Sequence, residues 1–319
     1  MLNLIKNEWM KIFRRPGTYV MIGLLLFMVT ITGAFIKYQE QGGSVPDNQN
    51  WEQGLLLENE SLKKQMEELG DRIPENTLLY YERQIALNEY RMEHHISPNE
   101  EYSVWSFVKD TSLMIDFAGL FTIIIAAGIV ASEFNWGTIK LLLIRPINRA
   151  RILGAKFMMV LLFGFLMLFL LFAYSTLLGA VLFGFPENPA PYLSYYQGSI
   201  TEQSMPLHLF SFYCFESISM YMLAAMAFMI SAVFRNNSLA IGLSLFLMFT
   251  GRQATELIAM KFSWAKYVLF ANTDLMQYFT GVPMVEGMTL PFSVFMLLIY
   301  FILFLYLAYI VFKKRDVAS

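Results

Sequence analysis

Residues 157–185 read FMMVLLFGFLMLFLLFAYSTLLGAVLFGF, a stretch that contains no charged side chain. A helix that crosses the hydrocarbon part of a bilayer needs about 20 predominantly apolar residues, because each residue adds about 1.5 Å of length. The stretch therefore predicts a transmembrane helix, and it indicates the class of the protein before any other feature is considered.

Further apolar runs of similar length share this character; they cover residues 18–36, 111–131, 207–234, 238–260 and 291–312. Of the 319 residues, 56% are hydrophobic and 15% are charged. Soluble domains average roughly 45–50% apolar and 25% charged residues. The first run is too long for a signal-peptide core and lacks a small-residue cleavage pattern after it. We expect an all-α polytopic membrane protein with six transmembrane helices, and we exclude a soluble enzyme.

Lysine and arginine gather in particular segments between the apolar runs. Among the short segments outside the runs they are most frequent in residues 1–17, 132–156 and 313–319, and Arg235 separates the fourth run from the fifth, whereas the loop 186–206 has neither. Basic residues favour the cytoplasmic side of a membrane. With six crossings, all of these basic segments lie on one side, so we predict that both termini are cytoplasmic.

The two longest segments outside the apolar runs have different characters. Residues 1–17 place apolar side chains at helical steps beside Lys and Arg, which predicts an amphipathic helix in the headgroup plane. Residues 37–110 carry fifteen acidic and seven basic residues, a net charge of -8. Helical periodicity between Asn59 and Arg91, divided at Pro74, predicts two helices there. This outer segment either caps the outer face as a solvated hairpin or gates and recognises a substrate.

The cytoplasmic loop 132–156 contains the motif EFNWGTIK at residues 133–140, followed by LLLIRPINR at 141–149. Gly137 permits a sharp turn after the second run, and Asn148 can cap the helix that leads into the third. Between them, residues 138–144 form a short apolar stretch that Pro146 ends. We expect a short helix on the cytoplasmic surface, which either rests on lipid headgroups or is covered by a partner.

This motif, the Pro-x-x-Arg and the Lys before the third run resemble the type-2 ABC exporter permeases. The resemblance covers nearly the whole chain, including the N-terminal segment, which corresponds to that family's elbow helix. It implies that the loop is a coupling helix that docks on an ATPase subunit. The implied coupling residues are Glu133, Gly137, Thr138, Lys140, Leu142, Pro146 and Arg149.

The resemblance also implies the partners of the chain. The sequence has no Gly-x-x-x-x-Gly-Lys-Ser/Thr loop, so ATP and Mg would be bound by a partner and no cofactor by this chain. A functional unit would then contain two ATPase subunits and a second permease chain in the bacterial plasma membrane. The basic residues are accounted for by membrane topology, so no nucleic-acid partner is expected.

Ionisable residues also occur inside the apolar runs, in the outer half of the membrane: they are Asp116, Glu216, Arg252 and Glu256. Such residues are costly in a bilayer and usually face protein or water. They form either the polar wall of an outward cavity or a gate held by ion pairs, unless the fifth run is short and Arg252 and Glu256 lie outside it. Arg252 and Glu256 are four residues apart and can pair on one helix.

Other chemistry finds little support in the sequence. His94 and His95 are neighbours that point about 100° apart on a helix, so they cannot share a metal ion without further ligands.

The aromatic and polar segment 261–290 looks like a re-entrant helical pair of related exporters. The sequence predicts the permease of an exporter for an antimicrobial peptide, an antibiotic, or another small amphiphile or ion. A gradient-driven carrier and a non-transporting membrane sensor are the alternatives.

Overall fold

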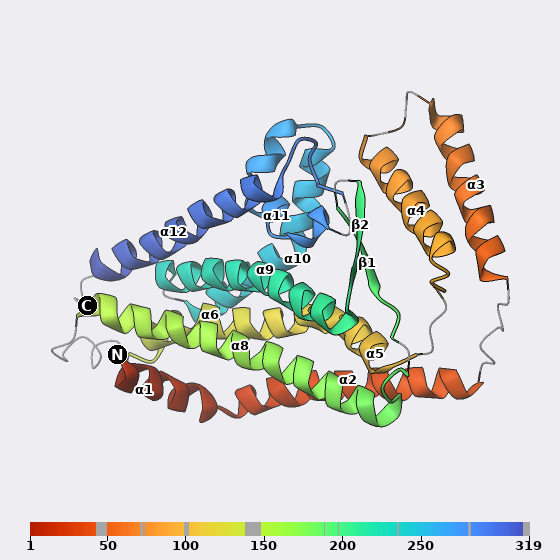
Figure 1. Ribbon diagram of the computed structural model, residues 1–319. Coiled ribbons are helices and arrows are strands. Elements are labelled where there is room, and N and C mark those ends of the chain that lie inside the picture. Colours follow the sequence, from red (N-terminus) through yellow and green to blue (C-terminus); the bar gives the residue numbers. More distant parts are fainter. Residues whose placement is uncertain are drawn as a thin grey trace.

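Long helices dominate the computed structural model, which describes residues 1–42, 50–70, 73, 75–98, 102–137, 148–187, 189–196, 198–234, 236–279 and 282–314. The α-helices are α1 Leu2–Phe13, α2 Pro16–Gly42, α3 Trp51–Leu69, α4 Glu75–Glu93, α5 Val104–Thr111, α6 Ile115–Asn135, α8 Arg149–Leu182, α9 Met205–Val233, α10 Asn237–Ala259, α11 Leu269–Asn272 and α12 Leu290–Lys314. Most of them form an elongated bundle, and the pair α3–α4 stands at one end of it (Figure 1).

Five helical segments are long and apolar enough to cross a membrane: Pro16–Glu40, Val104–Asn135, Arg149–Leu182, Met205–Val233 and Leu290–Lys314. The second of them joins α5 to α6 through the short 3₁₀ turn Ser112–Met114, and it begins before the predicted residue 111. Helix α10 packs against α6 and α9. It is not among the five because Arg252, Gln253 and Glu256 make its C-terminal part polar. The chain is therefore a predominantly helical membrane protein, and the sixth crossing stays a prediction.

Helix α6 lies at the centre of the bundle, between α8, α9 and α10. Both α6 and α9 carry fully buried small residues, Ala126 and Ala127 on α6 and Ala224 and Ala227 on α9. Small side chains let two helix backbones approach closely in a membrane protein. The hydroxyl of Ser231 accepts hydrogen bonds from the backbone N–H groups of residues 130 and 131 at 3.2 and 3.0 Å. Helices α6 and α9 thus form a tightly packed centre.

The outer surface of the bundle is apolar on α2 and α12. Only 17% of the most apolar window of each of these helices is buried inside the chain. Large side chains such as Phe27, Phe35, Phe295 and Ile302 are each more than half exposed. A soluble protein rarely exposes apolar surface on this scale. These faces therefore fit contact with lipid.

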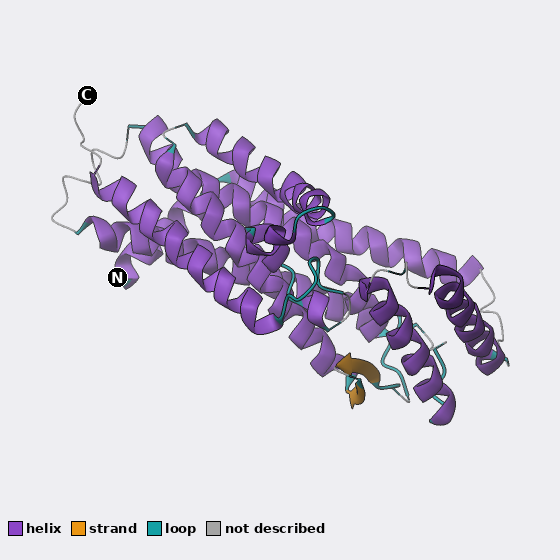
Figure 2. Ribbon diagram, turned by 90° about the horizontal axis from the view of Figure 1, so that it is seen from above, coloured by secondary structure: helices purple, strands orange, loops and turns teal. Residues whose placement is uncertain are grey.

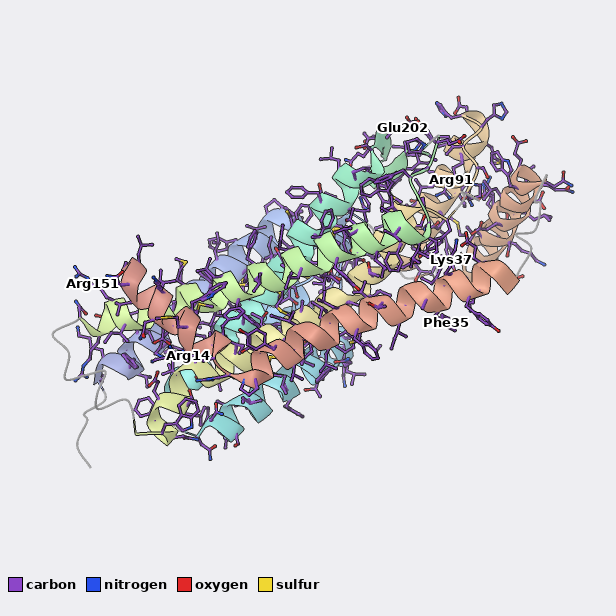
Figure 3. All side chains as sticks on the ribbon, turned by 90° about the horizontal axis from the view of Figure 1, so that it is seen from below. Arg14, Phe35, Lys37, Arg91, Arg151 and Glu202 are labelled. Atoms are coloured by element: carbon purple, nitrogen blue, oxygen red, sulfur yellow. The ribbon has the colours of Figure 1, made fainter. Side chains whose placement is uncertain are left out.

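Helix α1 and the C-terminal end of α12 lie at the same end of the bundle (Figure 1). The guanidinium of Arg149, which begins α8, donates to the carbonyl of Lys313 near the end of α12 at 2.9 Å. Figure 3 shows Arg14 and Arg151 at this end, and Lys37, Arg91 and Glu202 toward the opposite end. We call these the terminal end and the hairpin end.

The hairpin end carries the two predicted helices of segment 37–110. Helix α3 begins at Trp51, before the predicted Asn59, and packs antiparallel to α4. The side-chain amide of Asn88 on α4 donates to that of Asn59 on α3 at 3.0 Å, and both residues are buried. Leu55 and Leu87 are buried, whereas Leu69 is 42% exposed, so the apolar positions of the pair are covered only in part. The sequence periodicity predicted the two helices themselves correctly.

Two features of the hairpin end differ from the expectation. Residues 192–196 and 199–203 form an antiparallel pair of strands, β1 and β2, so the chain is not entirely helical (Figure 2). Segment 261–290 forms three short helical turns, Ser263–Tyr267, α11 and Met276–Tyr278, in place of a pair of re-entrant helices. The amide of Asn272 donates to the carbonyls of Lys266 and Val268, both at 2.8 Å. These bonds satisfy backbone carbonyl groups that would accept backbone N–H groups in a longer helix. They therefore favour compact turns over a continuous helix in this segment.

Candidate functional site

A cluster of buried charges joins three helices at the terminal end. Lys156 of α8 is only 1% exposed, and its ammonium donates to Glu8 of α1 at 2.8 Å, to Glu133 of α6 at 3.0 Å and to the carbonyl of Ile129 at 3.0 Å. Lys11 of α1 donates to Glu8 at 3.0 Å and to Glu133 at 2.7 Å. We call Glu8, Lys11, Glu133 and Lys156 the basal ion cluster.

The charges of the basal ion cluster compensate one another. Two carboxylates face two ammonium groups, and each carboxylate contacts both cations. Burial lowers the pKa of Lys11, but the hydrogen bonds and charges of Glu133 and Glu8 outweigh it and raise that pKa above its ordinary value. A buried charge is tolerated when it is paired and its hydrogen bonds are satisfied. The cluster therefore fixes α1 against the ends of α6 and α8.

The basal ion cluster lies at the two ends of the predicted coupling loop. Glu133 belongs to the last turn of α6, and Gly137 follows with a φ of 68°, a left-handed conformation that favours glycine. On the other side, the side chain of Asn148 accepts from the N–H of Ala150 at 2.9 Å and caps α8 as predicted. Between them, the predicted coupling residues Thr138, Lys140, Leu142 and Pro146 lie outside the described residues.

Two further contacts connect the ends of this loop to other helices. The guanidinium carbon of Arg15, between α1 and α2, lies 4.7 Å from the ring centroid of Trp136, which caps the C-terminus of α6. Arg149, a predicted coupling residue, binds the end of α12 as described above. The described residues on the two sides of positions 138–147 thus belong to α6 and α8 and contact α1, α12 and the residue between α1 and α2.

Sequence reasoning did not find the basal ion cluster. It assigned Lys11 and Lys156 to basic segments that mark membrane topology, and it did not single out Glu8. One signal was available, because Glu8 is the only acidic residue among the first 39 and lies beside apolar residues on a helix. Lys11 is a local partner of Glu8, but Lys156 is 148 positions away, and only the packing of α1 against the bundle brings Glu8 and Lys156 together.

A second polar region lies toward the hairpin end. A cavity of about 380 Å³ is lined by residues of α6, α9, α10 and α11, among them the predicted residues Asp116, Glu216 and Arg252. Arg252 donates to Glu256 at 3.1 Å and to Asp274 at 3.0 Å. The pair predicted from the four-residue spacing of Arg252 and Glu256 is therefore confirmed. We call this the inner cavity.

A larger cavity of about 870 Å³ adjoins the inner cavity at Arg252, which lines both. Glu256 lines the larger cavity but not the inner one. Three of the four predicted residues, Asp116, Glu216 and Arg252, therefore line the inner cavity. The fourth, Glu256, lines the larger cavity instead. Asp274 was missed because its segment was interpreted as a re-entrant helical pair, and nothing in its neighbourhood indicated that it would meet Arg252.

Comparisons with known proteins assign the chain to a family. A family model described as "Protein of unknown function (DUF2705)" matches residues 76–318. The chain belongs to this family. The protein YhcI of Bacillus subtilis (strain 168), described as uncharacterized, is 52% identical over 325 residues, and the match covers all of both chains. YdbK of the same organism, described as an uncharacterized membrane protein, is 34% identical over 200 residues, which is 61% of this chain and 76% of YdbK. The second description agrees with the apolar helices seen here.

Proposed function

We propose that this DUF2705-family chain is the transmembrane permease subunit of an ABC exporter, driven by a separate ATP-binding subunit. The observation that carries the proposal is the basal ion cluster. It holds α1 against both ends of the loop 138–147, the segment whose motif resembles a coupling helix. A force applied to this loop would reach α1, α6 and α8 together.

The remaining parts of the proposal follow from this assignment. Six crossings, α10 included, place both termini in the cytoplasm of a bacterial plasma membrane, and the hairpin end then faces outward. Two ATPase subunits and a second permease chain, identical or different, complete the unit, with ATP and Mg on the ATPase. The inner cavity, which contains charged and aromatic side chains, supports export of a small amphiphile, an antibiotic or a peptide.

Co-purification tests the proposal. The tagged chain, extracted from native membranes with a mild detergent, is expected to retain a polypeptide with ATPase activity. Leu142→Asp should abolish this association, because it puts an unpaired charge into an apolar docking surface. Leu142 lies outside the described residues, so its choice depends on the sequence motif alone.

Leu57→Asp is the matched control. Leu57 lies on α3 at the hairpin end and is 61% exposed, so the same substitution there should leave the ATPase bound. A wild-type preparation from native membranes without any ATPase would contradict the proposal. Undiminished association in a normally expressed Leu142→Asp variant would refute the docking role of the loop.

A further inference from the structure

We infer that the inner cavity binds a monovalent organic cation with an aromatic or otherwise apolar body. The inference deepens the proposed function, since it names the class of molecule that the permease would carry. It starts from the cavity itself, whose volume of about 380 Å³ is many times the roughly 30 Å³ that one water molecule occupies in the liquid. A space of this size between helices is suited to a small organic molecule.

The wall of the inner cavity has an apolar part and a charged part. Phe212 of α9, Phe249 of α10 and Phe270 of α11 contribute aromatic rings, and Leu223 and Met248 add aliphatic surface. Aromatic faces attract cations in addition to offering apolar contact. A ligand that fills this cavity would therefore bury apolar surface against the rings.

The charged part carries an excess of negative charge. Asp116, Glu216 and Asp274 line the cavity, and Arg252 is the one cation among its lining residues. Arg252 is already bound to Asp274 and Glu256. Within the part of the chain that the structure describes, Asp116 and Glu216 form no hydrogen bond or ion pair. These two carboxyl groups therefore provide the charge for a bound cation.

The arrangement favours an organic cation over a metal ion. No group of three His, Cys, Asp or Glu side chains among the described residues is close enough together to hold a metal. Metal ions such as Ca²⁺ require about six to eight oxygen ligands that converge on one point. The carboxyl groups here come from α6 and α9 and are spread over a wall that also holds phenyl rings. A bulky cation with a diffuse charge suits a wall that combines carboxyl groups with phenyl rings.

Arg252 lies between the inner cavity and the larger cavity. It lines both the inner cavity and the larger cavity of about 870 Å³, and its guanidinium bridges α10 to Asp274. A cation in the inner cavity would repel Arg252 and compete with it for the carboxylate of Asp274. Occupancy of the cavity is therefore coupled to the contact between α10 and the turn that carries Asp274.

Equilibrium dialysis of the purified full-length chain in neutral detergent tests the inference. The probe is tetraphenylphosphonium, and tetraphenylborate serves as an anion of nearly the same shape. Saturable binding is expected for the cation and not for the anion. Glu216→Gln and Asp116→Asn each preserve the shape of the side chain and should weaken binding by about tenfold or more. Asp116 is exposed, so its variant is expected to fold even if Glu216→Gln does not.

Glu187→Gln is the matched control, because Glu187 is exposed in the loop after α8 and does not line the cavity. It should bind the cation as the wild type does. No saturable binding in the wild type, equal binding of the anion, or unchanged affinity in Asp116→Asn would each overturn the inference. Because the dialysis measures binding without ATP, such a failure would leave the proposed coupling role intact, and loss of ATPase co-purification would leave the cation site intact.

Discussion

At the scale of single residues, the buried side chain of Lys156 shows how α1 is held against the bundle. Its ammonium has three hydrogen-bond partners from two helices and is almost inaccessible to water. An ion pair in such a place contributes little net stability over an apolar pair, but the loss of one partner leaves a charge without compensation. The loss of Lys156 would therefore weaken the contact between α1 and the bundle.

Lys156→Met tests this contact. We expect the variant to lose about 3–5 kcal/mol of unfolding free energy, because Glu8 and Glu133 would then share Lys11 alone. The measurement is the thermal unfolding midpoint of the purified protein in detergent. Glu8→Gln combined with Lys156→Met should recover part of the loss, since it removes the carboxylate left without its partner.

Lys11→Met is the matched control for this change. The side chain of Lys11 is 35% exposed, so water compensates more of its loss, and a decrease of about 1 kcal/mol or less is expected. Equal midpoints for Lys156→Met and the wild type would show that the basal ion cluster does not hold α1.

At the scale of elements, α10 contacts the turn α11 through an unusually close approach. A Cβ atom on Gly251 would overlap the ring of Phe270. The absence of a side chain at Gly251 lets the polar end of α10, with Arg252, lie against the turn that leads to Asp274. The position of Arg252 between the two cavities therefore depends on its neighbour in the sequence.

Gly251→Ala is expected to destabilise the protein by about 1–3 kcal/mol, because the ring of Phe270 must shift in a packed site. Gly242→Ala, in the same helix, is the control, since a Cβ there meets nothing within 4 Å. Alanine favours helices over glycine by about 0.5–1 kcal/mol, so the control should be neutral or slightly stabilising. Thermal unfolding of both variants measures the difference, and a midpoint for Gly251→Ala as high as that of Gly242→Ala would contradict the close approach.

The elements also show what the sequence could and could not reveal. Helices α3 and α4 follow from apolar residues at helical steps and from Pro74, which are local signals. The strands β1 and β2 were missed, although Tyr192–Tyr196 is rich in tyrosine and Gly198, with a φ of 81°, occupies the turn. Both features are typical of a strand followed by a turn. The sequence analysis nevertheless treated the segment 186–206 only as a loop between two apolar runs.

The sequence indicated the charged residues of the inner cavity but did not indicate the basal ion cluster. Asp116, Glu216 and Arg252 stood out because charge is rare inside an apolar run, and the structure brings them to one cavity. Glu8 and Lys156 stood in segments where charge is ordinary. Their pairing depends on how α1 folds back under α8, which is a long-range contact that no local pattern encodes.

At the scale of the whole molecule, polar groups are concentrated at two levels of an apolar bundle. The basal ion cluster lies at the terminal end and the inner cavity toward the hairpin end, and α6 and α9 run between them. Glu133 and Asp116 belong to the same helix α6. A displacement of α6 along its axis would therefore move Glu133 in the basal ion cluster and Asp116 in the inner cavity together. An energy-coupled exporter requires such a mechanical link between its base and its cavity.

Cysteine accessibility tests the orientation of this whole arrangement. In a Cys214→Ser background, which removes the one native cysteine, single cysteines replace the exposed residues Arg14, Ser199 and Lys314. A membrane-impermeant maleimide should label Ser199→Cys in intact cells, and Arg14→Cys and Lys314→Cys only after permeabilisation. Six crossings with a cytoplasmic N-terminus require this result, because an even number returns both termini to the same side. If α10 did not cross, Arg14 and Lys314 would lie on opposite sides of the membrane, and exactly one of the two variants would be labelled in intact cells.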